Sequence, residues 1–316
     1  MTVPTTIGVD LGGTKMAAAV VDSHGRIVRE VRVARPIDGE SMRTDALELA
    51  AGLLTDDVVA IGLGVAGLVT ADGTMVWGPN VPGENIPFRR LVGQRFGLPV
   101  AVDNDANMAA LAEARVGAAT GFAHSITITL GTGIGGGLIL NGEIFRGASF
   151  AGEIGHVKVN VGGATCTCGQ RGCWETFASG RRLDQIARDV AAAEPTGPVA
   201  RLAGDEVPNG SHLTAAALGG DRTACRQLAD MGTWLGIGIA NLIAILDPHR
   251  IVIGGAVSAA GDLLLEPARQ AVAETLEGSS HRPQVSIVGA QLGASAGVIG
   301  AALAAHDLVT GVEDHG

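Results

Sequence analysis

The sequence predicts an α/β protein with two related halves, each built around a mixed β-sheet. Predicted strands alternate with predicted helices along the 316 residues, a pattern that favours the α/β class. A strand, a glycine turn and a second strand within 7–21 recur within 124–147. Aligning Ile7 with Ile126 also brings Gly12 onto Gly131, although few other identities remain. This internal similarity indicates a repeated structural unit.

In the first half, alternating apolar residues predict two strands within 7–21 and a third at 26–34. The pattern that follows predicts a helix at 40–54, a buried strand at 58–66, a Pro/Gly loop at 77–83, a helix at 88–96 and a strand at 99–105. Asn104 or Asp105 can cap the next helix.

The second half repeats the opening strands and then becomes richer in helices. It predicts strand, glycine turn, strand and hairpin at 124–147, helices at 179–193, 211–219 and 221–246, a strand at 251–258, a helix at 261–277, a strand at 284–288 and a last helix at 292–306.

Composition narrows the classes of function. The chain is long enough for two domains, and 47% hydrophobic with 17% charged residues is typical of a globular protein. A net charge of −10 without a basic patch makes nucleic acid an unfavourable partner. It does not exclude an anionic substrate, because backbone N–H groups can bind phosphate locally.

The first ten residues lack the basic start and apolar core of a signal peptide. The longest apolar helix candidate, 231–246, is shorter than a membrane span and contains Asn241, so we expect a buried core helix and no membrane partner. These expectations indicate a cytoplasmic protein, in which thiols stay reduced. Cys225 stands alone in a helical pattern and is expected to be a small buried hydrophobe.

Three of the four cysteines cluster with a histidine and two acids in one stretch, 153–175. Reduced, clustered thiols favour metal binding over disulfides. Three thiolates and an imidazole are the ligand set of a closed tetrahedral zinc site. The candidate ligands are His156, Cys166, Cys168 and Cys173, bracketed by Glu153 and Glu175. A zinc site would hold those two carboxylates rigidly, ready to bind a polar ligand.

Three glycine clusters follow apolar strands, where successive N–H groups can point at an anion without a Cβ in the way. They are Gly12-Gly13-Thr14-Lys15, Gly131-Thr132-Gly133 and Gly254-Gly255. Each alone is weak evidence, because an ordinary tight turn explains a single cluster better. Three in one chain, two of them in a repeated context, favour binding of a nucleotide polyphosphate.

Two other glycine motifs do not fit. The segment 131–136 matches the G-x-G-x-x-G pattern, but that dinucleotide fingerprint requires a following helix. The residues that follow read as a strand and a hairpin turn instead. No G-x-x-x-x-G-K-[ST] sequence occurs, so the chain is not a P-loop enzyme.

Asp105 lies where a predicted strand ends and a helix begins, the position at which ligands collect in open α/β sheets. An ordinary helix cap is the competing interpretation. A carboxylate there could accept a proton from a sugar hydroxyl as it attacks a γ-phosphate. Asp10, just before the first glycine loop, is placed to hold Mg²⁺ through water while Lys15 faces phosphate.

Taken together, five motifs in this order resemble the ROK family within the actin-like, hexokinase-like ATPase fold. They are DLGGTK at 10–15, DNDAN at 103–107, LGTGIGGG at 130–137, EIGH at 153–156 and CTCGQRGCWE at 166–175. The resemblance covers nearly the whole chain, and segments 178–183 and 242–255 look most like actinobacterial ROK glucokinases.

This resemblance implies an actin-like (ribonuclease H-like) fold and ATP-dependent phosphorylation of the glucose 6-hydroxyl with Mg²⁺. The implied domains are 1–118 with 294–316, and 119–293. Asp105 matches the catalytic base. The sugar-binding set is Gly67, Asn80, Asn104, Asp105, Glu153, His156 and Glu175. The nucleotide set is Asp10, Gly12, Gly13, Thr14, Lys15, Gly131, Thr132, Gly133, Gly254 and Gly255. His156 and the three clustered cysteines match structural zinc ligands, and family members are commonly homodimers, some homotetramers.

Two alternatives stay open. The sugar could be N-acetylglucosamine, N-acetylmannosamine, fructose or allose, with polyphosphate as a second donor, because the contacts recognise hydroxyls that several hexoses share. ROK proteins also include sugar-responsive repressors, which carry a winged helix-turn-helix ahead of the core. The first glycine loop begins at Gly12, which leaves no room for such a domain before it, and the acidic charge also disfavours DNA binding.

Overall fold

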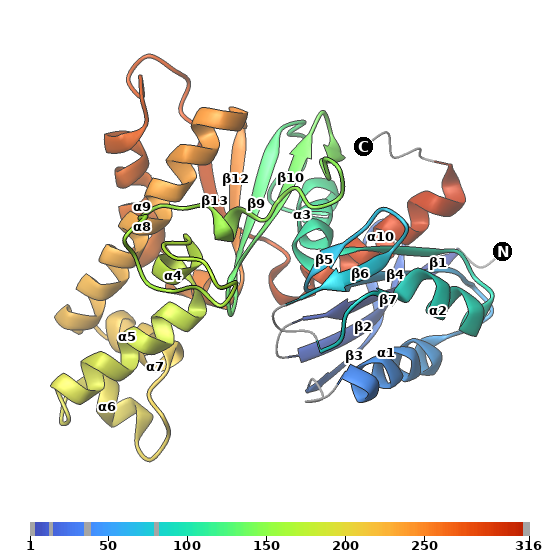
Figure 1. Cartoon of the computed structure of the whole chain (residues 1–316), viewed down its shortest axis with the longest axis horizontal. Helices are drawn as coiled ribbons and strands as arrows, with labels where there is room; N and C mark the ends of the chain where they lie inside the picture. The colour runs from blue at the N-terminus through green and yellow to red at the C-terminus, as the bar shows by residue number, and fades with distance from the viewer. Residues whose placement is uncertain (1–3, 13–14, 35–38, 79–81, 312–316) are drawn as a thin grey trace. The chain divides into compact units, whose positions relative to one another are not determined.

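The computed structural model describes residues 4–12, 15–34, 39–78 and 82–311. The chain divides into two compact units (Figure 1). Unit 1 comprises Met1–Thr127, Gly136–Gly152 and Ala290–Gly316, and unit 2 comprises Ile128–Gly135 and Glu153–Gly289. The division into 1–118 with 294–316 and 119–293, implied by the family resemblance, stays a prediction.

Unit 1 is organised around a five-stranded sheet of order β3-β2-β1-β4-β8. Its strands are β1 (Thr5–Leu11), β2 (Lys15–Asp22), β3 (Ile27–Ala34), β4 (Val58–Val65) and β8 (Val100–Asn104). β2 pairs antiparallel with β1 and β3, whereas β4 pairs parallel with β1 and β8. The sheet is therefore mixed, as predicted, and the parallel pairing aligns the carboxyl ends of β1, β4 and β8 at one edge.

Helices cover both faces of this sheet. Alternation along β1 sends Ile7 and Val9 into a core shared with α1 (Gly39–Leu53) and α2 (Phe88–Phe96). On the other face, α3 (Asp105–Val116) and α10 (Ala296–Thr310) pack against β2. Unit 1 also contains a small sheet of β5 (Leu68–Val69), β6 (Thr74–Trp77) and β7 (Ile86–Pro87), which was not predicted from the sequence.

α10 lies unusually close to the sheet. A Cβ added at Gly8 would stand 1.9 Å from the carbonyl oxygen of Val298, and one at Gly62 would stand 1.8 Å from that of Ala301. Any side chain at these two positions would push the helix away. Glycine at these two positions allows the backbones to approach closely, and it packs α10 against β1 and β4, which end at Leu11 and Val65.

The second sheet has the order β11-β10-β9-β12-β13. Its strands are β9 (Ser125–Leu130), β10 (Ile134–Leu140), β11 (Glu143–Ile144), β12 (Arg250–Gly254) and β13 (Ser286–Gly289). Numbered within each half, both sheets read 3-2-1-4-5. The shared order confirms the repeat that the sequence indicated, and the two mixed sheets confirm the predicted fold class.

Helices of unit 2 follow the sheet. They are α4 (Glu175–Ala178), α5 (Gly180–Ala193), α6 (Pro198–Ala203), α7 (Gly210–Leu218), α8 (Arg222–Leu246) and α9 (Asp262–Thr275). Unit 2 also has two short 3₁₀ turns, η1 (Ile154–His156) and η2 (Ala256–Ala260). A further 3₁₀ turn, η3 (Gly293–Ser295), precedes α10 in unit 1. α8 and α9 pack closely because Gly232 and Gly236 face the carbonyl oxygens of Leu264 and Ala268.

The predicted strand at 251–258 is wrong in its second half, because β12 ends at Gly254. Gly255 has a φ of 84°, in the left-handed region, and a Cβ there would stand 2.5 Å from the carbonyl oxygen of Leu130. The backbone turns away from the sheet at this point and continues as η2.

Two helical segments, Arg222–Leu246 and Gly293–Thr310, have the length and composition of a membrane span. The predicted helix at 221–246 is confirmed as α8, whose whole length, unlike that of its apolar part 231–246, reaches that of a membrane span. About half of each span is buried inside the structure, 56% and 50%. Packing against α9 accounts for the apolar character of α8, in agreement with the predicted core helix.

Glu113 is a fully buried carboxylate on α3 whose partners are backbone N–H groups. Oε2 accepts from Ala118 at 2.7 Å, and Oε1 accepts from Gln291 at 3.0 Å and Leu292 at 2.9 Å. Charge-assisted bonds of this kind offset the cost of burying a carboxylate. They attach α3 to the segment that leads into α10.

We expect Glu113→Gln to lower the free energy of unfolding by about 2–4 kcal/mol. An amide keeps the shape but turns an NH₂ group toward backbone N–H donors, so at least one buried donor loses its acceptor. Denaturant unfolding would measure the effect. The exposed Glu277→Gln is the control and should change stability by less than about 0.5 kcal/mol; equal midpoints for the two variants would contradict this account of Glu113.

Candidate functional site

The turn between β8 and α3 holds the central predicted residues. Asn104 is the helix cap: its Oδ1 accepts the N–H groups of Ala106 at 2.8 Å and Asn107 at 3.3 Å. Its Nδ2 donates to the carbonyl oxygen of Gly67 at 3.1 Å. Asp105 is the first residue of α3, so Asn104 is the capping member of the two residues considered. The structure thereby brings Gly67 and Asn104 together.

Asp10 and Asp105 are close enough to influence each other's charge. Burial and the charge of Asp105 raise the pKa of the Asp10 carboxyl to about 7, with Arg32 opposing the shift. Asp10 is the penultimate residue of β1 and Asp105 follows β8, which places both at the carboxyl edge of the sheet. A pair of adjacent carboxylates of this kind is a suitable environment for a divalent cation.

Other predicted residues of unit 1 are placed less fully. Lys15 is exposed at the start of β2, and Gly12 is half-buried just after β1. Gly13, Thr14 and Asn80 lie outside the described residues.

Asp103 has a structural role at the same turn. Its carboxylate is buried, accepts from Asn107 Nδ2 at 2.9 Å and pairs with Arg146 Nε at 2.7 Å. Its Oδ1 also accepts the Asn104 N–H at 2.6 Å. Arg146 follows β11 and was not singled out in the sequence, where nothing local connects it to residue 103. The ion pair holds the turn that presents Asp105.

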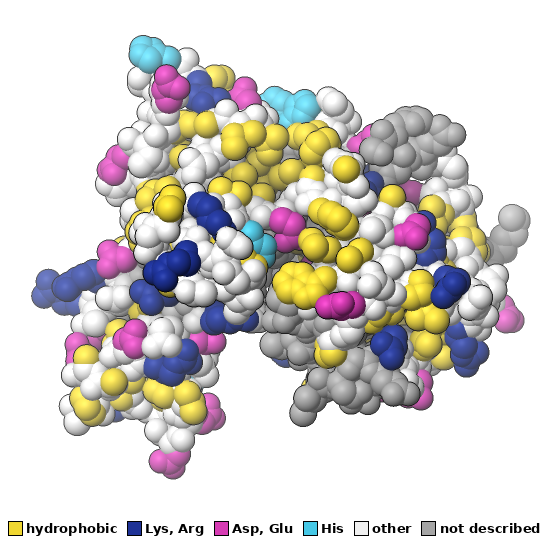
Figure 2. Space-filling model, in the orientation of Figure 1, with side chains coloured by type: hydrophobic (Ala, Val, Ile, Leu, Met, Phe, Trp, Pro, Cys, Tyr) yellow, Lys and Arg dark blue, Asp and Glu magenta, His cyan; other side chains and the backbone are white. Residues whose placement is uncertain are grey.

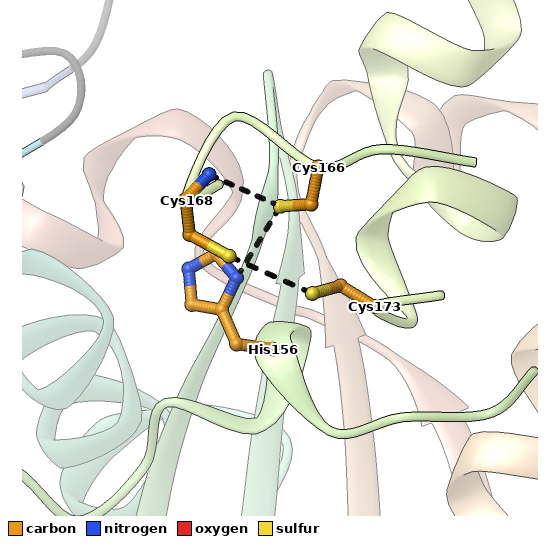
Figure 3. A group of neighbouring side chains, drawn as sticks. All are labelled: His156, Cys166, Cys168 and Cys173. Carbon is orange, nitrogen blue, oxygen red and sulfur yellow. Dashed lines mark hydrogen bonds between the residues drawn. The ribbon is translucent and has the colours of Figure 1, made fainter. Parts of the chain in front are cut away.

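In unit 2, the four predicted metal ligands converge (Figure 3). The donor atoms of His156, Cys166, Cys168 and Cys173 all lie within 4.8 Å of one another. His156 Nδ1 is 3.6 Å from Cys166 Sγ, and the sulfurs of Cys168 and Cys173 are also 3.6 Å apart. Tetrahedral zinc, with bonds of about 2.3 Å to sulfur and about 2.0 Å to nitrogen, separates its ligands by about 3.5–3.8 Å. The donor set therefore fits zinc.

The two bracketing acids lie beside this cluster. Glu175, 9% exposed, accepts from Cys166 Sγ at 2.8 Å, and burial together with this bond raises the pKa of the Cys166 thiol. Glu153 Oε2 is 4.0 Å from His156 Nε2. Partial burial raises the pKa of Glu153, the charge of Glu175 adds to the shift, and His156 opposes it. Glu153, His156 and Glu175 therefore form one polar group.

Two glycine loops of unit 2 also meet. Gly131 accepts the N–H of Gly180 at 2.8 Å, and Thr132 accepts that of Arg181 at 3.3 Å, so the loop rests on the start of α5. The contact between Gly255 and Leu130 brings the third glycine cluster to the end of β9. A Cβ at Gly133 would stand within 2.4 Å of Glu175 Oε2, which links the loop to the acids beside the cysteines.

The predicted site residues thus form two groups. In unit 1 the structure gathers Gly67, Asn104, Asp105 and Asp10 at one sheet edge. In unit 2 it gathers the glycine loops, Glu153, Glu175 and the His/Cys cluster.

Comparisons with known proteins match most of the chain to one family. The sequence model of the ROK family matches residues 6–308. A glucokinase of Streptomyces coelicolor is 40% identical over 305 residues, covering 94% of this chain and 96% of that protein. A putative xylose repressor of Caldicellulosiruptor is 34% identical over 277 residues, covering 84% of this chain and 69% of the repressor. The crystal structure of a ROK family glucokinase from Streptomyces griseus with glucose and AMPPNP superposes with a TM-score of 0.89 at 41% identity, covering 96% of this chain and 99% of that one.

Proposed function

The chain belongs to the ROK family, and we propose that it is a glucokinase that transfers the γ-phosphoryl group of ATP to the 6-hydroxyl of D-glucose. The near full-length similarity to Streptomyces glucokinases supports the reaction class. The observation that carries the proposal is the pair of neighbouring carboxylates, Asp10 and Asp105, at the carboxyl edge of the first sheet. Asp105 can act as the general base, and Asp10 can favour binding of a divalent cation.

Asp105 is the proposed general base. Its Oδ1 accepts the N–H of Ala106 at 2.9 Å, which orients the carboxylate. As the first residue of α3 it lies at the positive end of the helix dipole, which favours the ionised form. An ionised carboxylate can accept the 6-hydroxyl proton while the hydroxyl oxygen attacks the γ-phosphorus in line with the leaving oxygen.

Sugar binding is assigned to residues with complementary hydrogen-bonding capacity. Asn104 has its Oδ1 engaged as the helix cap and one Nδ2 hydrogen donated to Gly67, so its role toward sugar is that of an N–H donor. Glu153 and Glu175 accept from hydroxyl groups. With Nδ1 of His156 directed at the cysteines, Nε2 is the nitrogen that can meet a hydroxyl. Asn80, outside the described residues, and Gly67 complete the proposed set.

ATP is assigned to the glycine clusters: Gly12, Gly13, Thr14, Lys15, Gly131, Thr132, Gly133, Gly254 and Gly255. Mg²⁺ beside Asp10 would relieve the repulsion between Asp10 and Asp105 and neutralise phosphate charge. Zn²⁺ held by His156, Cys166, Cys168 and Cys173 would be structural, fixing the orientation of the imidazole. We further propose a cytoplasmic enzyme that forms a homodimer or a homotetramer.

The test is a coupled assay of the purified protein with a panel of hexoses and with ATP or polyphosphate as donor. Glucose with ATP should give the highest kcat/KM, and the same mixture without enzyme supplies the background rate. A higher kcat/KM for N-acetylglucosamine, N-acetylmannosamine, fructose or allose, or for polyphosphate as donor, would move the assignment to another ROK kinase. Glucose turnover no faster than the background would reject the kinase itself.

The similarity to a xylose repressor makes sugar-responsive DNA binding the second candidate. A net charge of −10 opposes it, because non-specific DNA affinity depends on neutralising phosphates. A gel-shift assay at physiological salt distinguishes the two candidates: specific, sugar-sensitive retardation of DNA would favour the repressor.

A further inference from the structure

Lys158 lies directly opposite Cys173 in a short antiparallel bridge. The Val159 N–H donates to Gly172 at 3.0 Å, and the Trp174 N–H donates to Val157 at 2.9 Å. Residues opposed in this way project side chains to the same face. The Lys158 Nζ accordingly donates to Cys173 Sγ at 2.9 Å. The position of the Lys158 ammonium beside the Cys173 sulfur therefore follows from the pairing of the two backbone segments.

The charge of the cluster explains what such a cation can do. Zn²⁺ with three thiolates and a neutral imidazole carries a net charge of −1, and the carboxylates of Glu153 and Glu175 lie beside it. Zinc thiolates are usually stabilised by N–H donors around the sulfurs. Cys166 receives the backbone N–H of Cys168 at 3.4 Å, and Cys168 receives that of Gln170. Cys173 receives the ammonium of Lys158.

Cys173 differs from the other two sulfurs in that its donor is a full positive charge on an exposed side chain. Figure 2 shows several Lys and Arg side chains on the face of unit 2 that carries α4 and its loops. Lys158 and Arg171 are both exposed and both belong to the cysteine-bearing segment. Among the contacts that the structure describes, Lys158 reaches a sulfur and Arg171 reaches none.

We propose that Lys158 is a positioning residue that retains the zinc ion, by neutralising the excess negative charge of the cluster and by lowering the reactivity of the Cys173 thiolate. The inference rests on the zinc assignment within the proposed function. A thiolate is the nucleophile toward electrophiles and the ligand of the metal. A hydrogen bond from the Lys158 ammonium makes the Cys173 thiolate less nucleophilic, which slows alkylation, and harder to protonate, which slows its loss from the metal.

The experiment compares four purified proteins in their zinc-loaded form: wild type, Lys158→Met, Lys158→Arg and Arg171→Met. Zinc transfer to an excess of a colorimetric chelator gives the release rate, and iodoacetamide labelling followed by peptide mass spectrometry gives the alkylation rate at each cysteine. Loss of an outer-shell partner commonly weakens metal binding by about tenfold or more. Lys158→Met should therefore release zinc about tenfold faster and alkylate faster at Cys173 than at Cys166.

Lys158→Arg, which keeps a cationic donor, should restore most of the retention, and Arg171→Met should behave like wild type. Lys158→Met releasing zinc within twofold of wild type would overturn the proposal. Equal acceleration in Arg171→Met would also overturn it, because the effect would then be general surface charge. If Lys158→Met fails to fold, Lys158→Gln, which keeps a neutral N–H donor but removes the charge, takes its place in both measurements. Zinc release from that variant within twofold of wild type would likewise overturn the proposal.

The zinc content and the glucokinase rate of the wild type separate this inference from the proposed function. A wild type without zinc overturns the role of Lys158 while leaving the phosphoryl transfer assay to judge the kinase. A zinc-containing wild type that phosphorylates no sugar rejects the kinase while leaving the retention measurement valid.

Discussion

Asp105→Asn is expected to lower kcat for glucose phosphorylation by about 10²- to 10⁴-fold while leaving sugar affinity within about threefold of wild type. The amide is nearly isosteric, and its oxygen can still accept the Ala106 N–H that the carboxylate accepts at 2.9 Å. What it loses is the ability to take the hydroxyl proton. Steady-state kinetics together with glucose binding by calorimetry would separate the two effects.

Asp103→Asn is the matched control for the same turn. Asp103 is buried and paired with Arg146 at 2.7 Å, so this variant should lose thermal stability. Asp105→Asn should keep it, because the site residue is not part of that ion pair. A kcat for Asp105→Asn within about threefold of wild type would remove Asp105 as the base. A stability loss as large as that of Asp103→Asn would instead assign Asp105 a structural role.

Cys168→Ser is expected to abolish zinc binding, to lower the free energy of unfolding by about 3 kcal/mol or more and to weaken glucose binding at least tenfold. Cys168 is one of four donor atoms within 4.8 Å, and a serine hydroxyl is a poor replacement for a thiolate. The sugar effect follows because His156 and Glu175 both contact Cys166 within the same cluster. Metal analysis should fall from about one zinc per chain to almost none.

Cys225→Ser provides the control, since Cys225 lies on α8 away from the cluster and donates to the carbonyl oxygen of Ala217 at 3.4 Å. It should keep zinc, stability and affinity. A destabilised, zinc-free Cys168→Ser protein with unchanged glucose affinity would break the proposed link between metal and sugar. A metal-free preparation of the wild type with full activity would remove zinc from the assignment.

Local patterns in the sequence were sufficient for most of the elements and for the grouping of the metal ligands. The alternation in 7–21 and its return in 124–147 predicted strands that the structure contains, in two sheets of the same strand order. His156 and three nearby cysteines predicted a cluster because three thiols and an imidazole within one short stretch are the ligand set of a zinc site, and the structure brings the four together. Patterns of this kind depend only on residues close together in the sequence, so they can be recognised without knowledge of the fold.

Contacts between distant segments required the tertiary structure. The carboxylates of Asp10 and Asp105 influence each other because β1, β4 and β8 pair in parallel and end at one edge. β12 stops at Gly254 because Gly255 meets the backbone of Leu130, the last residue of β9, which is far away in the chain. Asp103 pairs with Arg146 across more than forty positions, and nothing in either local pattern indicated it.

The sequence by itself therefore determined which residues could do the chemistry: a His/Cys set for zinc, glycine loops for phosphate and an acid at a strand end. The tertiary structure decided which of these residues act together and which neighbours support them. Residue type and spacing carry chemical capacity, whereas proximity between Asp103 and Arg146, or the approach of Gly133 to Glu175, depends on how strands and helices pack. That packing depends on the whole chain, so a short segment of the sequence does not predict it.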